Sequence, residues 1–359
     1  MSKQLGNSPD LLGLIDKYGA DAVRFGILIS SPAGNDLLWD EASNEQGRNF
    51  NNKLWNALKL VKMWEGRQPA ANSPQSAVGI QQSTVGSQQS SGNFAIEWFE
   101  NRLNEVKAEL ENLYKDFRLS EALKTVYSLI WDDFCSWYLE WVKPGFEQPI
   151  EKDVYQKTVY FFEELMQLLH PFMPFITEEI YHQLKERKKG DDLTVRQQAQ
   201  VSGHQPGVLE QGKLLKELIT GLRDIRIKQQ IKPKESIRLF IQTQQQNIYP
   251  PIQSILCKQV NAEHLTFVNE AEPGTISSVI GKDKFYLLTE QPVNTENQKE
   301  ELQKELNYLK GFLVSVEKKL GNERFVQNAK PEVIEVERKK KSDAEAKIKA
   351  IEESLTNLN

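Results

Sequence analysis

The sequence predicts a mainly α-helical protein that combines a helix bundle, a small α/β domain and an antiparallel coiled-coil hairpin. Apolar residues recur at helical spacing through most of residues 41–200. Short runs rich in β-branched and aromatic residues, with Pro and Gly between them, lie within residues 201–292. Apolar residues then repeat at heptad spacing through residues 293–359, which is typical of paired helices.

The overall composition is that of an ordinary water-soluble protein. Hydrophobic residues make up 39% of the chain, and no apolar run approaches the roughly 20 residues that a membrane span needs. Cys135 and Cys257 have no Cys or His neighbour at metal-ligand spacing, so we expect no disulfide, no metal site and a cytoplasmic setting. Because the net charge is −5, local basic patches would have to hold any nucleic-acid partner.

The bundle is predicted from a series of amphipathic runs. Residues 1–40 indicate short helical pieces joined by turns, and residues 40–65 indicate one longer helix. Residues 68–93 consist almost entirely of Gln, Ser, Gly, Ala, Pro and Val, so we expect a flexible insert there. Helical periodicity returns over residues 94–188, including one helix over 119–141, which makes a bundle of about four or five long helices.

The small α/β domain is predicted to begin with an amphipathic helix that carries Leu215, Leu218 and Leu222. Its predicted strands are the β-rich runs at residues 236–242, 264–268 and 284–288.

Residues 293–359 contain two runs of apolar residues at heptad spacing. The first carries apolar residues at 4-3-4-3-4 spacing from Leu302 to Leu320, and the second extends from Ile334 to Leu358 beyond a break rich in Gly, Asn and Pro. Two arms of similar length around such a break indicate a helical hairpin. An arm of some 23 residues would span roughly 35 Å, so we expect a projecting structure.

Most catalytic constellations are absent from the sequence. It contains no nucleophile elbow, metal pair or Gly-rich phosphate loop. His170 ends an apolar run and is expected to be structural. Asp132 and Asp133 would point about 100° apart on a helix, so we expect surface or hydrogen-bonding roles. Only the opening loop, which contains Ser and Gly, indicates a chemical role. Its Lys3 could bind phosphate oxygens.

That opening resembles the second signature of class I aminoacyl-tRNA synthetases, Lys-Met-Ser-Lys-Ser followed by Leu-Gly-Asn. The match places Lys3 where the family has its ATP-phosphate lysine; the signature's first lysine is absent, and Gln4 replaces its final serine. The resemblance implies an ATP-dependent enzyme that uses Mg²⁺, with Ser2 and Lys3 binding ATP and Lys3 catalytic.

Further motifs extend the resemblance over nearly the whole chain outside the insert. Residues 18–25 look like the family's stem-contact helix, and residues 48–57, 131–140 and 170–179 look like the anticodon-binding bundle of the valine, leucine and isoleucine enzymes. The tail, at residues 319–326 and 329–334, resembles the C-terminal hairpin of valine–tRNA ligases. An isoleucine enzyme would be expected to end in a Cys-rich zinc module, and this chain has no such cysteines.

The resemblance implies four parts. These are a signature loop and stem-contact region (1–40), an anticodon-binding bundle (41–200), the small α/β domain (201–292) and a tRNA-binding arm (293–359). The nucleotide-binding sheet, first signature and editing domain would lie before Met1. We therefore expect this chain alone to bind valine-specific tRNA as a monomer, without ligation and without a tightly bound cofactor.

Candidate tRNA contacts combine cations, amide groups and an aromatic ring, because unstacked bases are read by stacking and by edge hydrogen bonds. Lys53 shares a helix face with Asn49 and Asn56, four and three positions away. The full set of candidates is Arg48, Asn49, Lys53, Asn56, Trp137, Lys143, Arg324, Arg338 and Lys339.

Several of these candidates have an alternative reading. Asn49 and Asn52 could instead bond neighbouring helices inside the bundle, Trp137 could belong to the core, and Lys143 could be a solvated charge. The charge run at 338–341 could be a solvated face of the hairpin. A basic cluster in the small domain could also meet phosphates; it comprises Arg223, Arg226, Lys228, Lys232 and Lys234.

Two other functions stay open at this point. The chain could be the corresponding part of an isoleucine or leucine enzyme. It could also be a non-catalytic interaction protein whose heptads pair with a second copy, with no RNA role.

Overall fold

The computed structural model describes residues 10–31, 34, 40–67, 91–145, 147–198, 202–289, 295–322 and 331–357. Ser2, Lys3, Arg324 and most of the predicted insert lie outside the described residues. The chain forms two compact units, Met1–Leu209 and Glu210–Asn359. Among the described residues, no helix is long and apolar enough to cross a membrane.

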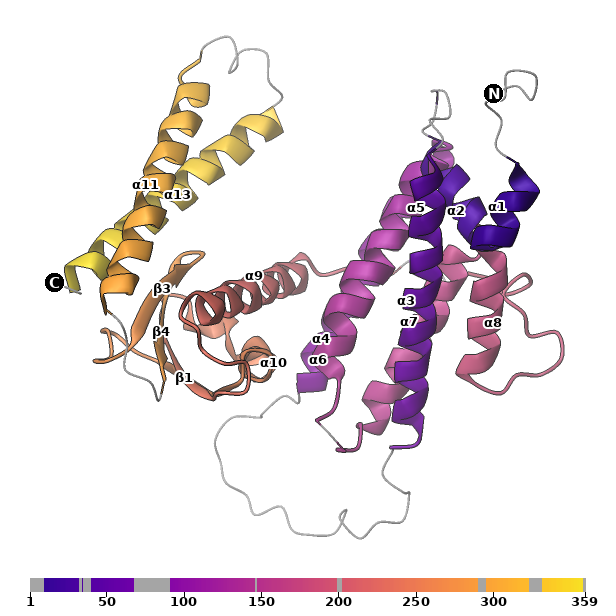
Figure 1. The fold of residues 1–359 in the computed structure, drawn as a ribbon, viewed down its shortest axis with the longest axis horizontal. Coiled ribbons are helices and arrows are strands. Elements are labelled where there is room, and N and C mark those ends of the chain that lie inside the picture. The colour runs from indigo at the N-terminus through magenta and orange to yellow at the C-terminus, as the bar shows by residue number, and fades with distance from the viewer. Residues whose placement is uncertain are drawn as a thin grey trace, which may run out of the picture. The chain divides into compact units, whose positions relative to one another are not determined.

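The first unit is a bundle of helices (Figure 1). Its long members α3, α4 and α7 lie side by side with a continuous helical segment made of α5, η3 and α6, while α1, α2 and α8 complete the unit. The elements are α1 (Leu11–Tyr18), α2 (Ala20–Ile29), α3 (Glu41–Glu65), α4 (Ser91–Lys115), α5 (Leu119–Ser128), η3 (Leu129–Tyr138), α6 (Leu139–Val142), α7 (Lys152–Leu169) and α8 (Pro174–Leu184).

The helix predicted over residues 119–141 is confirmed, but its middle is wider than an α-helix. The segment η3 is a π-helix of 10 residues, in which hydrogen bonds run from residue i to i+5. The Ser136 hydroxyl accordingly donates to the Trp131 carbonyl oxygen at 2.9 Å, five positions back. This wider turn changes which side chains of the aromatic-rich stretch share a face.

Aromatic side chains fill the centre of the bundle. The Phe99 ring lies 5.3 Å from Phe134, 5.0 Å from Tyr138 and 5.0 Å from Phe161, measured between ring centroids. These residues come from α4, η3 and α7, so the cluster joins three helices into one core.

Helices α2 and α3 approach closely because glycines line their contact. A Cβ atom on Gly47 would lie 2.7 Å from the carbonyl oxygen of Ala22 and 2.9 Å from its Cα atom. Both are backbone atoms, which cannot move without shifting α2. Gly47 therefore sets the distance between the two helices.

Buried charges join α4 and α7 and fix the chain that follows α8. The Lys107 ammonium lies 2.5 Å from a Glu164 carboxylate oxygen, and both side chains are buried. Arg196 pairs with the same carboxylate, while Arg187 pairs with Glu163 at 2.6 Å. Buried carboxylates need such partners, because an unpaired charge in the interior is costly.

The second unit contains a four-stranded sheet covered by helices. Strand order is β2-β1-β4-β3; β1 and β2 are parallel, and the other two pairs are antiparallel. Its elements are α9 (Pro206–Lys228), β1 (Ile237–Gln242), η4 (Gln246–Ile248), α10 (Pro250–Val260), β2 (Ala262–Phe267), β3 (Ile276–Ile280) and β4 (Asp283–Leu288). The three predicted strands are confirmed as β1, β2 and β4. Strand β3 was missed, because Ser277 and Ser278 interrupt its apolar pattern.

Two long helices end the chain, α11 (Thr295–Leu320) and α13 (Pro331–Asn357), and they pack against each other. Lys310 pairs with Glu352 at 2.7 Å, whereas Lys341 pairs with Glu317 at 2.9 Å. Because later residues of α11 meet earlier residues of α13, the two helices are antiparallel. The apolar residues at their contact are Leu302, Leu306, Leu309, Ile348 and Ile351, together with Val279 of β3.

We predict that Gly47→Ala destabilises the first unit by about 1–3 kcal/mol, because the new methyl group overpacks the contact between α2 and α3. Urea unfolding followed by tryptophan fluorescence measures this directly, since all seven tryptophans lie between Trp39 and Trp141. Gly66→Ala is the control, because a Cβ atom there meets nothing within 4 Å. Equal unfolding midpoints for the two variants would contradict the prediction.

Candidate nucleic-acid interface

Helix α3 presents one polar face. Asp40 caps the helix by accepting the Ala42 N–H at 3.1 Å, and the helix then runs without interruption to Glu65. Asn49 and Asn56 are exposed and Lys53 is half-buried. The structure therefore brings these three candidates to one side of α3, as their spacing requires.

Lys53 lies over an aromatic ring that the sequence analysis did not select. Its ammonium is 5.1 Å from the centroid of Trp131 in η3. Tyr127 stacks on the same indole, with ring centroids 5.5 Å apart and planes at 21°. Trp131 and Tyr127 are both half-buried, so a cation and two accessible rings meet here.

Arg48 belongs to a different part of the surface. Five positions along an α-helix correspond to about 140° of rotation, which separates Arg48 from Lys53. The Arg48 guanidinium lies 5.5 Å from the Tyr18 ring of α1 and 3.3 Å from the Glu45 carboxylate. The structure thus associates Arg48 with α1 and Lys53 with η3.

The burial of Asn49 and Asn52 bears on the alternative that they bond neighbouring helices inside the bundle. Asn49 and Asn52 are both exposed, which leaves Asn49 available to a ligand. Asn44 is the buried asparagine of this helix, and it lies against Gly26 of α2. A role inside the bundle therefore suits Asn44 better than Asn49.

Trp137 and Lys143 lie further along the same helical segment. Trp137 is half-buried, with its ring 6.0 Å from Trp141 in the core. Lys143 is exposed directly after α6 and lies 3.4 Å from the Glu140 carboxylate. Both retain an accessible surface.

Two residues of the predicted stem-contact motif hold the start of α8. The Asp21 carboxylate accepts the Ile176 N–H at 2.6 Å and the Phe175 N–H at 3.4 Å, which satisfies free donors at the beginning of that helix. Arg24 donates to the carbonyl oxygens of Pro171 and Phe172, each at 3.1 Å. Burial raises the pKa of Asp21, and these N–H donors partly oppose that rise.

In the small domain, Arg226 is buried and is therefore not part of the basic surface that the sequence predicts. Its guanidinium is buried and donates to the carbonyl oxygens of Val260 at 3.0 Å, Lys232 at 2.6 Å and Glu235 at 2.7 Å. Burial also lowers the pKa of Arg226. The proposal that this residue meets phosphates is wrong, because its donors are used inside the fold. Arg223 remains exposed.

On the second of the two terminal helices, α13, Arg338 and Lys339 are both exposed. Arg338 lies 3.2 Å from Glu335, one turn earlier on the same helix. Such an exposed pair is weak and readily exchanges for another anion.

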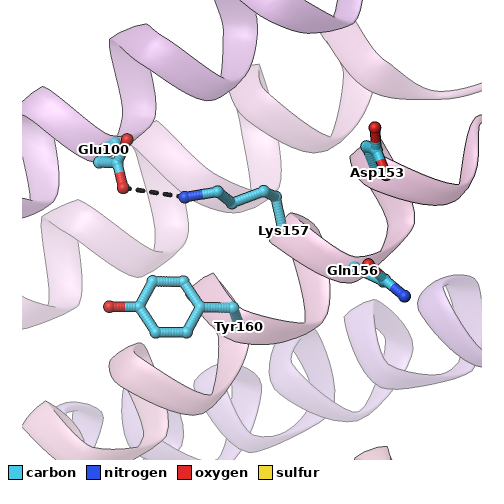
Figure 2. A pocket seen from close by; sticks show the side chains of 5 residues that line it. All are labelled: Glu100, Asp153, Gln156, Lys157 and Tyr160. Atoms are coloured by element: carbon cyan, nitrogen blue, oxygen red, sulfur yellow. Dashed lines mark hydrogen bonds and ion pairs between the residues drawn. The ribbon is translucent and has the colours of Figure 1, made fainter.

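A pocket of about 580 Å³ lies between α4 and α7 (Figure 2). Asp153, Gln156, Lys157 and Tyr160 line it from one face of α7, and Glu100 faces them from α4. The Lys157 ammonium lies 3.0 Å from the Glu100 carboxylate and 5.6 Å from the Tyr160 ring centroid. The sequence analysis missed this pocket, although the spacing of its four α7 residues at i, i+3, i+4 and i+7 was a usable signal.

Two of the histidines, His170 and His182, lie among hydrogen-bonding partners. His170 pairs through its ring nitrogens with Thr177 at 2.8 Å and Thr194 at 3.2 Å, in keeping with a structural role. Glu178, His182 and Asp192 bring potential metal ligands within 4.8 Å of one another. His182 Nε2 lies 3.2 Å from Glu178 and 3.0 Å from Asp192.

Comparison with known proteins identifies two domains. Residues 97–241 match the family described as the anticodon-binding domain of tRNA ligase, and residues 294–359 match the valyl tRNA synthetase tRNA binding arm. One solved structure, the ternary complex of Agrobacterium radiobacter K84 agnB2 LeuRS-tRNA-LeuAMS, has a TM-score of 0.38 and 14% identity over 58% of this chain. That likeness is too weak to support an argument.

Both matched families are described as parts of tRNA ligases. Over its whole length the chain is similar to the C-terminal part of valine–tRNA ligases. It is 43% identical to the valine–tRNA ligase of Parabacteroides distasonis and 44% identical to that of Phocaeicola vulgatus, in each case over 100% of this chain. The chain spans 39% of the length of these relatives.

We predict that Asp21→Ala destabilises the first unit by about 1–2 kcal/mol, because the start of α8 loses its acceptor. Urea unfolding followed by tryptophan fluorescence measures the loss. Asp10→Ala is the matched control, since Asp10 precedes α1 but makes no capping hydrogen bond with its side chain. Similar losses in both variants would show that the acceptor role of Asp21 is unimportant.

Both thiols should be unreactive in the folded chain. Burial raises the pKa of Cys135 to about 12 and that of Cys257 to about 11. At pH 8 an ordinary thiol with a pKa of about 8.5 is roughly a quarter ionised, whereas Cys135 would be ionised in about one molecule in ten thousand. Ellman's reagent at pH 8 should label two thiols in urea and neither rapidly in the native protein.

The same shifts have a defined effect on stability. Because folding raises both pKa values, the thiols' contribution to stability is complete below about pH 8.5 and is lost as the pH rises toward 11 and 12. Rapid native labelling at pH 8 would contradict this burial.

Proposed function

We propose that this chain is the tRNA-binding part of a valine–tRNA ligase and recognises valine-specific tRNA. One observation carries the proposal: an anticodon-binding domain and a valyl-type tRNA-binding arm occur on one chain that is similar over its whole length to valine–tRNA ligases. The arrangement of described side chains supports it, because the bundle surface presents cations, amides and accessible rings.

In this proposal the polar face of α3 contacts the anticodon stem and loop. Asn49 and Asn56 supply amide donors and acceptors, and Lys53 supplies a charge beside the stacked rings of Trp131 and Tyr127. Single-stranded RNA is recognised through this combination of stacking and edge hydrogen bonds. Arg48, Trp137 and Lys143 remain proposed contacts on neighbouring parts of the bundle.

We further propose that α11 and α13 form a coiled-coil hairpin that braces the outer corner of the tRNA. Their apolar contact and their antiparallel ion pairs support this geometry. Arg338 and Lys339 would meet phosphates, as would Arg324 at the predicted hairpin tip. Such contacts add affinity that falls with salt but do not read sequence.

The ligation chemistry is proposed for the whole ligase: joining valine to tRNA with ATP and Mg²⁺. Ser2 and Lys3 are the proposed ATP-binding residues of this chain, and Lys3 would stabilise the charge that develops on the phosphates. For the chain by itself we expect tRNA binding without ligation.

The proposal predicts that the chain binds a transcript of valine tRNA more tightly than the same transcript with altered anticodon bases. Lys53→Gln should weaken binding to the valine transcript about 5-fold, which corresponds to about 1 kcal/mol. Fluorescence anisotropy at fixed salt measures both effects.

Lys59→Gln provides the matched control. It removes the same charge from α3 at an exposed position, about 120° around the helix from the half-buried Lys53. Equal binding of the two transcripts would overturn the recognition claim, and equal losses in the two variants would remove Lys53 from the interface.

A further inference from the structure

Three potential metal ligands converge where α8 meets the segment that follows it. Glu178, His182 and Asp192 each present one ligand atom, and these three atoms lie within 4.8 Å of one another. Glu178 and His182 are four positions apart on α8, so they share a face of that helix. Asp192 comes from the segment after α8. The cluster therefore combines one imidazole nitrogen with two carboxylate oxygens from two parts of the chain.

The distances within the cluster suit a small divalent cation. His182 Nε2 lies 3.2 Å from a Glu178 oxygen and 3.0 Å from an Asp192 oxygen. Two ligands bound about 2.0–2.2 Å from a tetrahedral zinc ion lie roughly 3.3–3.6 Å apart, so an ion fits after small movements of the side chains. The three side chains are 27–46% exposed, which leaves a path for the ion and room for coordinated water.

Pairing among the three side chains alone is a less complete arrangement than coordination. His182 Nε2 carries either one proton or one lone pair, whereas two carboxylate oxygens face it. One proton cannot give each oxygen a full hydrogen bond, and the two carboxylates repel each other. A divalent cation between them attracts all three ligands and offsets both negative charges.

Neighbouring groups hold the cluster in place. The Leu193 N–H donates to the Glu178 oxygen that faces His182, at 2.9 Å. Hydrogen bonds of this kind orient the ligands of metal sites. His170 lies beside the other Glu178 oxygen, at 3.7 Å from its Nε2, and the same nitrogen is 3.2 Å from the Thr194 hydroxyl. His170 therefore neighbours the cluster without being one of its three ligands.

We propose that Glu178, His182 and Asp192 form a binding site for one divalent transition-metal ion, and that zinc suits the site best. Imidazole and carboxylate ligands together suit zinc, whereas Mg²⁺ and Ca²⁺ prefer oxygen ligands alone. Water completes the coordination. The sequence analysis expected no metal site, because Asp192 lies outside α8 and its spacing from the other two ligands gives no sign of the cluster.

The ion has a structural role in this proposal. It connects α8 to the segment after it, and that segment contains Arg187 and Arg196, which pair with Glu163 and Glu164 of α7. Both of these carboxylates are buried. Binding of the ion therefore stabilises the part of the chain that neutralises them.

Calorimetric titration of ZnCl₂ into the full chain, first freed of metal with a chelator, measures the binding. One ion should bind per chain, and Glu178→Gln and His182→Gln should each weaken binding at least about 10-fold. Gln at position 178 keeps an acceptor for the Leu193 N–H, so the fold is preserved. Glu179→Gln and His204→Gln are the matched controls, because they make the same changes at exposed positions outside the cluster, and both should bind zinc like the parent.

Histidine signals in NMR spectra identify the ligand directly. The chain contains four histidines, so selective ¹³C labelling gives a simple spectrum. ZnCl₂ should shift the His182 signal most, and His182→Gln assigns that signal. His204 and His264 are exposed outside the cluster and should keep their positions.

Stability provides an independent measurement. Zinc at about 100 times its Kd should raise the thermal unfolding midpoint of the parent by about 5 °C or more, because only the folded chain assembles the site. The same addition should leave the midpoint of His182→Gln unchanged.

Three outcomes would overturn the metal site. They are equal zinc affinity in the parent and His182→Gln, a largest shift at another histidine, and displacement of zinc by an equal concentration of MgCl₂. None of these measurements involves tRNA, so the metal site and the proposed function stand or fall separately.

Discussion

The buried ion pair between Lys107 and Glu164 sets the register of α4 against α7, and the bundle surface depends on that register. The exposed pair of Glu100 and Lys157 lies seven positions earlier on each helix, and both pairs join residues 57 positions apart. Seven residues span about 10.5 Å of helix, so the parallel helices stay aligned over this length. Because a buried charge cannot remain unpaired cheaply, a slip of one helix is strongly disfavoured. The α4–α7 pocket is a consequence of this alignment.

A second constraint acts at the other side of the unit. Gly47 allows α2 to approach α3 at backbone distance, and Asp21 and Arg24 then connect α2 to the start of α8. These contacts use polar groups of α2 to satisfy backbone groups that would otherwise be unpaired at a helix end. The motif that looks like a stem-contact helix therefore has a structural task in this chain, beside any contact with RNA.

Prediction from sequence worked best where spacing alone carries the information. The helix over residues 119–141 and three of four strands were found from local periodicity. Prediction from sequence worked less well for a residue type that can serve either as a surface contact or as a buried hydrogen-bond donor. Arg226 carries the charge expected of a phosphate contact, yet it is buried and donates to four backbone carbonyl oxygens of its own domain. Strand β3 was missed because its place in the sheet comes from pairing with β4, not from its own alternation.

The sequence by itself determined three things: the mainly α-helical fold, the two terminal helices and the likeness to tRNA ligases. It could do so because periodicity and motifs are local properties of the chain. Only the tertiary structure decided which side chains meet. Lys53 lies over Trp131 rather than Trp137, and Glu100 faces Lys157 across two helices. These encounters join residues far apart in the chain, and they depend on helix register and on the wider turn of η3. Packing of the whole core sets that geometry, which no local pattern encodes.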